Sequence, residues 1–159
     1  KKDEYPVQYA TTQNNLGTAY TYLPSATPEE RAENVRKAIA CYKAALEIYK
    51  KDEYPVDFAM TQNNLGTAYT DLPSATAEER ADNVKKAIAC YKAALEIYKK
   101  NEYPQYFCQT AENLGMLLVS IGNTKEGCHW LREAMALKQF LPDRGERLES
   151  LIKEFCSDK

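Results

Sequence analysis

One 49-residue segment occurs twice in succession, and this repetition is the feature that most constrains the fold. Residues 1–49 recur as residues 50–98 with only seven substitutions. A third copy begins at Lys99, because Glu102-Tyr103-Pro104 matches Glu4-Tyr5-Pro6, but it then diverges and shortens. A fixed period of this length is typical of stacked repeat arrays, in which each unit packs on its neighbours. We therefore expect a linear array that offers a long surface, whereas a catalytic centre needs unlike groups that converge at one place.

Each repeat contains two segments with helical periodicity. Residues 6–23 carry apolar side chains at helical spacing, and Pro6 suits a first helical turn because its missing N–H would be unpaired there. Thr27-Pro28-Glu29-Glu30 forms a capping box that begins a second helix, which we expect to end near Lys50. The predicted fold class is all-α, an α-solenoid of antiparallel helix pairs.

We expect one solenoid domain over residues 1–159. Its predicted parts are repeat 1 (1–49), repeat 2 (50–98), repeat 3 (99–142) and a C-terminal capping helix (143–157). The capping helix is predicted because Leu148, Leu151, Ile152 and Phe155 fall on one helical face, with charged residues on the rest of its surface. Such a helix covers one end of an array.

The charge and hydropathy of the chain exclude several classes of partner. The formal net charge is -2 and the isoelectric point is near 5.6, so no long-range positive field would attract nucleic acid. The longest apolar stretches are far shorter than the roughly 20 residues of a membrane span. With no signal peptide in the first residues, the expected location is the cytoplasm. Lys1-Lys2 matches the linker pair Lys50-Lys51, so we expect the chain to be a fragment of a longer protein.

The cysteines are well separated, with no CxxC pair and no histidine at metal-ligand spacing. They are Cys41, Cys90, Cys108, Cys128 and Cys156. An odd number of scattered thiols fits a reducing compartment, where cysteine fills space as a small apolar residue. We therefore expect no metal site and no cofactor.

Candidate catalytic residues are few. His129 is the single histidine, and the sequence places no acid, base or nucleophile in an obvious partnership with it. Gly17, Gly66 and Gly115 stand alone inside helical segments, which indicates close helix packing and not a phosphate-binding loop. The sequence therefore predicts a protein without enzymatic activity.

The repeat resembles the tetratricopeptide repeat. The residues that carry the resemblance in repeat 1 are Leu16-Gly17, Tyr20, Ala38, Tyr42 and Ala45, with Leu65, Gly66, Tyr69, Ala87, Tyr91 and Ala94 in repeat 2 and Leu114, Gly115, Leu118, Gly127, Leu131 and Ala134 in repeat 3. Repeats 1 and 2 are longer than the standard unit of about 34 residues. They look closest to the extended repeats of kinesin light chains and of bacterial multi-repeat proteins. The resemblance implies a right-handed superhelix whose first helices line a concave, peptide-binding groove.

The predicted groove set consists of the first-helix residues that point away from the second helix. They follow from taking Leu16 and Tyr20 as core and rotating about 100° per residue. The set comprises Gln8, Thr11, Asn14, Asn15, Thr18 and Tyr22 in repeat 1, Asp57, Met60, Asn63, Asn64, Thr67 and Asp71 in repeat 2, and Gln109, Glu112, Asn113 and Met116 in repeat 3. Asn15, Asn64 and Asn113 form a ladder of amides that either grips a peptide backbone or holds the next helix.

The substitutions between the twin repeats bear on the same face. Three of the seven change chemical character and lie in the groove set: Gln8 to Asp57, Thr11 to Met60 and Tyr22 to Asp71. This pattern fits either tuning for a ligand or free drift of an exposed face. No member of the set is basic, so the expected partner is a neutral to basic extended peptide or protein segment. The alternative is a structural module that self-associates end to end through its first repeat.

Overall fold

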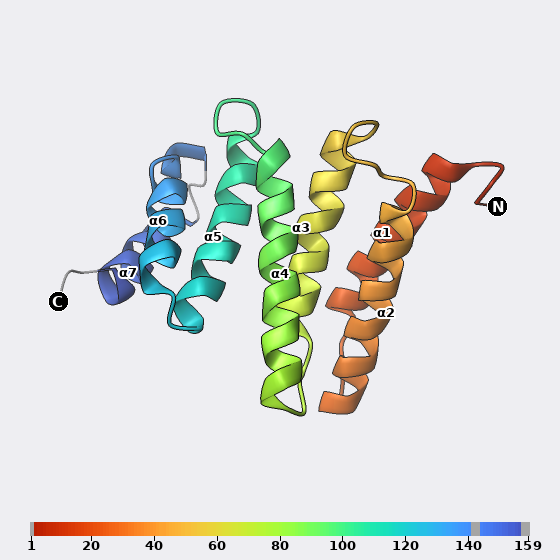
Figure 1. Ribbon diagram of the computed structural model, residues 1–159, viewed down its shortest axis with the longest axis horizontal. Helices are drawn as coiled ribbons and strands as arrows, with labels where there is room; N and C mark the ends of the chain where they lie inside the picture. The colour runs from red at the N-terminus through yellow and green to blue at the C-terminus, as the bar shows by residue number, and fades with distance from the viewer. Residues whose placement is uncertain (1, 141–143, 157–159) are drawn as a thin grey trace. The chain divides into compact units, whose positions relative to one another are not determined.

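The computed structural model covers residues 1–159 and describes residues 2–140 and 144–156 (Figure 1). The helices are α1 (Pro6–Tyr22), α2 (Pro28–Leu46), α3 (Pro55–Asp71), α4 (Ala77–Ile97), α5 (Pro104–Ser120), α6 (Thr124–Met135), the 3₁₀ turn η1 (Lys138–Phe140) and α7 (Gly145–Phe155). Within these two ranges the chain forms no strand, so the all-α prediction is confirmed. Two compact units, Lys1–Ala94 and Leu95–Lys159, are described separately below.

The helix starts follow the predicted signals. Proline is the first residue of α1, α2, α3 and α5. At α2 the Thr27 hydroxyl accepts a hydrogen bond from the Glu30 backbone N–H at 3.1 Å, and the Glu30 carboxylate accepts one from the Ala26 N–H at 2.8 Å. Thr76 caps α4 in the same way although Ala77 replaces the proline, so the cap forms without it. The α2 helix ends at Leu46, four residues before the predicted end.

Glycines allow the helices of each pair to approach closely. A Cβ atom added at Gly17 would lie 2.7 Å from a ring carbon of Tyr42, and one at Gly66 would lie 2.8 Å from the same atom of Tyr91. Both tyrosine rings are buried. The packing role predicted for these glycines is therefore confirmed.

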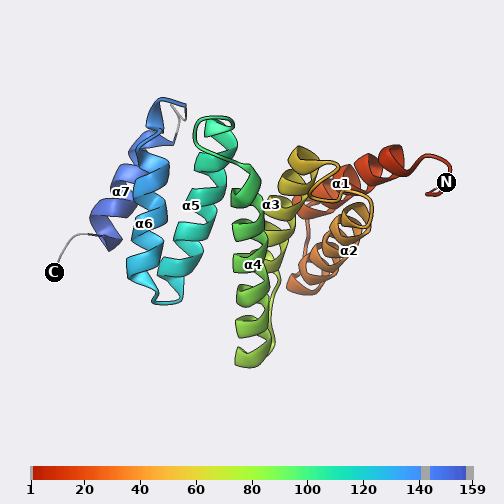
Figure 2. The ribbon, with the colours of Figure 1, turned by 45° about the horizontal axis from the view of Figure 1, so that its top comes forward.

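In the first unit, α3 packs on α2 of the preceding helix pair, and polar side chains join it to α1 (Figures 1 and 2). The Asn14 side-chain oxygen accepts hydrogen bonds from the Thr61 hydroxyl at 3.2 Å and from the Asn64 amide at 3.4 Å. Asn14 and Thr61 are buried, so these bonds satisfy polar groups that would otherwise be costly inside the unit. The Asn64 amide thus holds a neighbouring helix, which is the second of the two roles considered for the amide ladder.

The core of α1 differs from the sequence expectation. Its buried residues are Ala10, Asn14, Gly17 and Thr21, whereas Leu16, predicted as core, is 40% exposed. Its counterpart in α3, Leu65, is 5% exposed. The reason is that this face of α3 packs on the preceding helix pair, α1 and α2. No described residues cover the corresponding face of α1. The rotation that defined the groove set therefore began from a reference that is not core in α1.

In the second unit, α5 packs on α6 and α7 packs on α6 (Figures 1 and 2). A disulfide joins Cys128 of α6 to Cys156 at the end of α7. The expectation that all cysteines are free thiols is therefore wrong for this pair, because folding brings together residues that are far apart in sequence. Cys41, Cys90 and Cys108 are free and buried, as predicted.

The capping helix is present as α7, which is shorter than predicted. It spans Gly145–Phe155 and buries Leu148 completely, while Leu151 and Ile152 are half-buried. The ends of the predicted segments at residues 141–143 and 157 lie outside the described residues.

Candidate binding surfaces

The structure divides the predicted groove set by burial. The exposed members are Gln8, Thr11, Asn15, Tyr22 and Asp71. The half-buried members are Thr18, Asp57, Met60, Asn64, Thr67, Gln109, Asn113 and Met116. The buried members are Asn14, Asn63 and Glu112, which occupy the same position in the three repeats.

The buried members of the set do not face an open groove. Asn14 binds α3 as described above, and Glu112, 2% exposed, binds α7. The Glu112 carboxylate oxygens lie 3.2 Å from an Arg144 guanidinium nitrogen and 3.5 Å from one of Arg147. Asn63 is 9% exposed, and its side-chain oxygen makes no hydrogen bond to any described residue. In repeats 1 and 3, this position therefore makes contacts between helices.

Three threonines of the set contact tyrosine hydroxyls in the second half of their own repeat. The Thr11 hydroxyl lies 2.7 Å from the Tyr49 hydroxyl, Thr18 accepts from the Tyr42 hydroxyl at 3.3 Å, and Thr67 lies 3.2 Å from the Tyr91 hydroxyl. Burial raises the pKa of Tyr42 and Tyr91 above the usual value, with smaller opposing effects from the threonine hydrogen bonds. The phenols are therefore neutral at physiological pH and act as hydrogen-bonding groups within each pair.

The remaining members in the first unit form a strip of accessible side chains along α1 and α3, here named the outer stripe. It comprises Gln8, Asn15 and Tyr22 on α1, with Asp57, Met60, Asn64 and Asp71 on α3. Tyr22, the single aromatic residue of the stripe, is 80% exposed. The side chains offer amides, a phenol, a thioether and carboxylates, which together can contact both the backbone and the side chains of a peptide.

Within the outer stripe, the Asp71 carboxylate has a close cation. Arg31 of α2 donates to it at 2.9 Å and also binds the Thr21 backbone carbonyl. The sequence did not point to Arg31 because it lies on the second helix of repeat 1, whereas Asp71 is on the first helix of repeat 2. The available signal was the Tyr22 to Asp71 substitution, which places a carboxylate where repeat 1 has a phenol.

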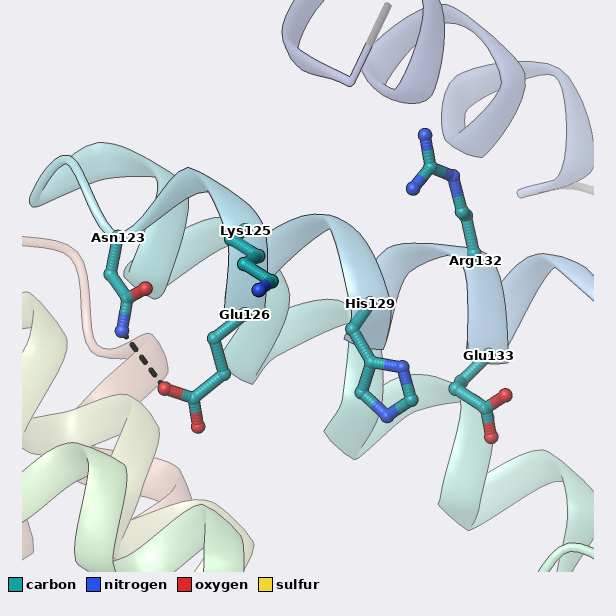
Figure 3. Close-up of a pocket in the computed structure, with 6 residues that line it drawn as sticks. All are labelled: Asn123, Lys125, Glu126, His129, Arg132 and Glu133. Carbon is teal, nitrogen blue, oxygen red and sulfur yellow. Dashed lines mark hydrogen bonds between the residues drawn. The ribbon is translucent and has the colours of Figure 1, made fainter. Parts of the chain in front are cut away.

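A shallow depression of about 670 Å³ lies on α6 (Figure 3). Asn123, Lys125, Glu126, His129, Arg132 and Glu133 line it. Its polar groups mostly bind their neighbours: the Asn123 amide donates to the Glu126 carboxylate at 2.8 Å, and Lys100 pairs with Glu133. Figure 3 shows Arg132 pointing away from the other lining residues, and it donates to the Cys156 carbonyl at 2.8 Å.

His129 is exposed, and its ring lies edge-on to Trp130 at 5.4 Å between centroids. Across residues 2–140 and 144–156, no group of three or more histidine, cysteine or acidic side chains could hold a metal ion. In the same part of the chain, every helix is too short or too polar to cross a membrane.

Comparison with known proteins corrects the family assignment. No curated protein matches the chain. A family model described as an uncharacterized protein conserved in bacteria (DUF2225) matches residues 8–157, and no tetratricopeptide family is found. The assignment to the tetratricopeptide family was therefore wrong. The residues that carried the resemblance are small and large side chains such as Gly17 and Tyr42, which any closely packed helix pair needs and which therefore do not identify one family. The chain belongs to the DUF2225 family.

Proposed function

We propose that this protein is a non-enzymatic scaffold that binds an extended peptide or partner segment along the outer stripe. The observation that carries the proposal is where the twin repeats differ. None of the seven substituted positions is buried in either repeat. Of the three that change chemical character, Gln8 to Asp57 and Tyr22 to Asp71 lie in the stripe in both repeats, and Thr11 to Met60 adds a stripe residue in repeat 2, since Thr11 itself contacts Tyr49. The other four substitutions are mostly conservative. Packing keeps the core residues the same in both repeats, while the first-helix face varies in chemistry, as a surface that binds different parts of a ligand would.

The charge of the stripe defines the kind of ligand. Asp57 and Asp71 are acidic, with Asp71 already paired with Arg31, and no stripe residue is basic. Asn15 presents an exposed amide, while the Asn64 amide donates to Asn14 and leaves its side-chain oxygen as an acceptor. A neutral or basic segment in extended conformation suits this surface, because its cations would meet carboxylates and its backbone would meet amides. An acidic peptide would meet the negative charge of Asp57, which no stripe residue offsets.

The proposal includes the larger architecture in which the stripe would work. The 49-residue period and the packing of α3 on α2 support a right-handed α-solenoid, in which first helices follow one another along one surface. We place the protein in the cytoplasm, with no nucleic-acid or membrane partner. In that compartment a disulfide such as Cys128–Cys156 would be transient or redox-sensing.

A selection experiment tests the proposal and does not require the partner to be identified. The oxidised full chain is immobilised and exposed to a random library of linear peptides. We expect enrichment of neutral to basic sequences that share a motif. The stripe variant (Asn15→Ala, Tyr22→Ala and Asp57→Ala) should not enrich them. The control variant (Glu33→Ala, Arg36→Ala and Lys85→Ala) removes three exposed side chains from α2 and α4 and should enrich the same motif. Equal enrichment by all three forms would refute binding at the stripe.

Self-association is a second candidate function, favoured by the exposed face of α1. Leu16, Ala19 and Tyr20 are more exposed than their counterparts Leu65, Ala68 and Tyr69, which are buried. The exposed set carries no charge, so two copies of this chain can meet there without like-charge repulsion. Light scattering at increasing concentration should show a dimer that Leu16→Ser disrupts. A constant monomer mass would exclude this candidate.

A further inference from the structure

The α7 helix occupies a docking position on the second unit. Glu112 of α5 lies two repeat periods after Asn14 of α1. In the first unit, Asn14 receives hydrogen bonds from α3, the helix that packs on α2. In the second unit, Glu112 receives Arg147 of α7, the helix that packs on α6, and Arg144, the residue directly before α7. Within its own unit, α7 therefore takes the place that a following repeat helix takes in the other.

Few apolar contacts hold α7 in this position. Of its 11 residues only Leu148 is fully buried, and Phe155 on its apolar face remains 37% exposed. An isolated helix of this length is marginally stable in water. Polar and covalent ties among the described residues include the two arginines on Glu112, the Lys138–Glu149 ion pair at 2.9 Å, the Arg132 bond to the Cys156 carbonyl, and the Cys128–Cys156 disulfide.

We propose that the α5–α6 face is a docking site for an amphipathic helix of a partner protein that presents two cations to Glu112, and that α7 covers it as an intramolecular ligand retained by the Cys128–Cys156 disulfide. The chemistry of the partner is read from α7 itself. The partner helix carries two cations three residues apart that both reach one carboxylate, as Arg144 and Arg147 reach Glu112. A leucine follows its second cation directly, as Leu148 follows Arg147.

The buried Glu112 makes the site selective for a cation. A carboxylate that is 2% exposed is costly to leave unpaired, so this face favours an occupant that supplies an arginine or lysine. An acidic or purely apolar helix would leave the charge without compensation. This site is separate from the outer stripe, and its proposal does not depend on peptide binding there.

Release of α7 requires reduction of the disulfide by a dithiol. A thiolate of the dithiol attacks one cysteine sulfur and forms a mixed disulfide, and its second thiol then displaces that cysteine. Two electrons and two protons pass to the protein, which gains the Cys128 and Cys156 thiols, while the dithiol becomes a cyclic disulfide. Both cysteines are buried in the closed form, so attack follows opening of the last turn of α7.

Hydrogen exchange on the full chain tests whether the Cys128–Cys156 disulfide retains α7. Reduction with dithiothreitol, or the Cys156→Ser substitution, should increase exchange of the α7 amides at least tenfold and leave the α5 and α6 amides protected. Two independent ways of breaking the bond separate loss of the disulfide from an effect of serine. Unchanged α7 protection in both, or loss of protection throughout α5 and α6, would overturn the proposal.

A fluorescent peptide tests the docking site. The probe has the sequence of residues 144–156 with Cys156→Ser, and its matched control carries Arg144→Glu and Arg147→Glu. By fluorescence anisotropy, the probe should bind the reduced chain at least tenfold more tightly than the oxidised chain, and the control peptide should not bind. Glu112→Gln in the reduced chain should weaken binding at least tenfold. Equal binding to both redox forms, or no dependence on Glu112, would contradict the proposal.

Discussion

At the scale of single residues, the glycine and tyrosine pairs set the distance between paired helices. Gly66 faces Tyr91 across the α3–α4 contact, and an alanine Cβ there would lie 2.8 Å from the ring. The ring is 2% exposed and has little room to move. The glycine is therefore retained for packing although it is a poor helix former.

The first prediction concerns this contact. Gly66→Ala should destabilise the protein by about 1–3 kcal/mol, since overpacking outweighs the gain in helix propensity. Urea unfolding followed by circular dichroism measures the change. Gly145→Ala is the control, because the nearest described atom to its Cβ would be the Lys138 Cβ at 3.8 Å, an ordinary contact distance, and we expect it to be neutral or slightly stabilising. A stabilising Gly66→Ala would contradict the packing account.

The second prediction separates two adjacent asparagines. Asn14→Ala leaves the buried Thr61 hydroxyl without its acceptor in α1 and should cost about 1–3 kcal/mol. Asn15→Ala removes an exposed side chain and should change the unfolding free energy by less than about 0.5 kcal/mol. The same unfolding assay compares them. Similar losses for both substitutions would show that the burial pattern of α1 is misassigned.

The third prediction uses the buried thiols. Burial raises the pKa of Cys90 and of Cys108 to about 11, with the Glu112 charge adding to the effect at Cys108. At pH 8 both should react with a chromogenic disulfide reagent far more slowly than in urea, because the thiolate is scarce and access is poor. The folded form favours the neutral thiols, so their contribution to stability should be lost as pH rises from about 9 to 11. Fast labelling of the native chain at pH 8 would refute this.

At the scale of helices, local signals predicted most of the structure. Pro6 and the Thr27 capping box mark helix starts that the structure confirms, since both depend on neighbours in sequence. Contacts between distant segments could not be predicted in the same way. The exposure of Leu16, the Arg31–Asp71 pair and the Cys128–Cys156 bond each depend on which helices pack together. The buried Glu112 was taken for a groove residue for the same reason.

The fourth prediction concerns how α7 is held. Removing both cations with Arg144→Ala and Arg147→Ala leaves the Glu112 carboxylate buried and unpaired, which should cost about 3–5 kcal/mol. Glu112→Gln should cost less, because both arginines are more exposed than Glu112 and can be solvated. Chemical unfolding of the oxidised chain measures both. A larger loss of unfolding free energy from Glu112→Gln than from the double arginine substitution would show that the arginines depend on Glu112 more than Glu112 depends on them.

At the scale of the whole molecule, the proposed binding function depends on the repetition of the chain. The repeated core makes two equivalent helix pairs, and the differing surface residues make their first helices chemically distinct. A scaffold needs both properties, since the core fixes the spacing of the first helices and the surface determines what they bind. Membership of the DUF2225 family is established for this chain by the match over residues 8–157.

The most direct test of the scaffold is calorimetric titration of a library-selected peptide into the oxidised chain. The account predicts saturable one-to-one binding that the stripe variant weakens at least tenfold and the control variant leaves unchanged, with both variants unfolding at the urea concentration of the parent. Equal affinity for all three proteins would place the peptide elsewhere and contradict the claim that the outer stripe is the binding surface.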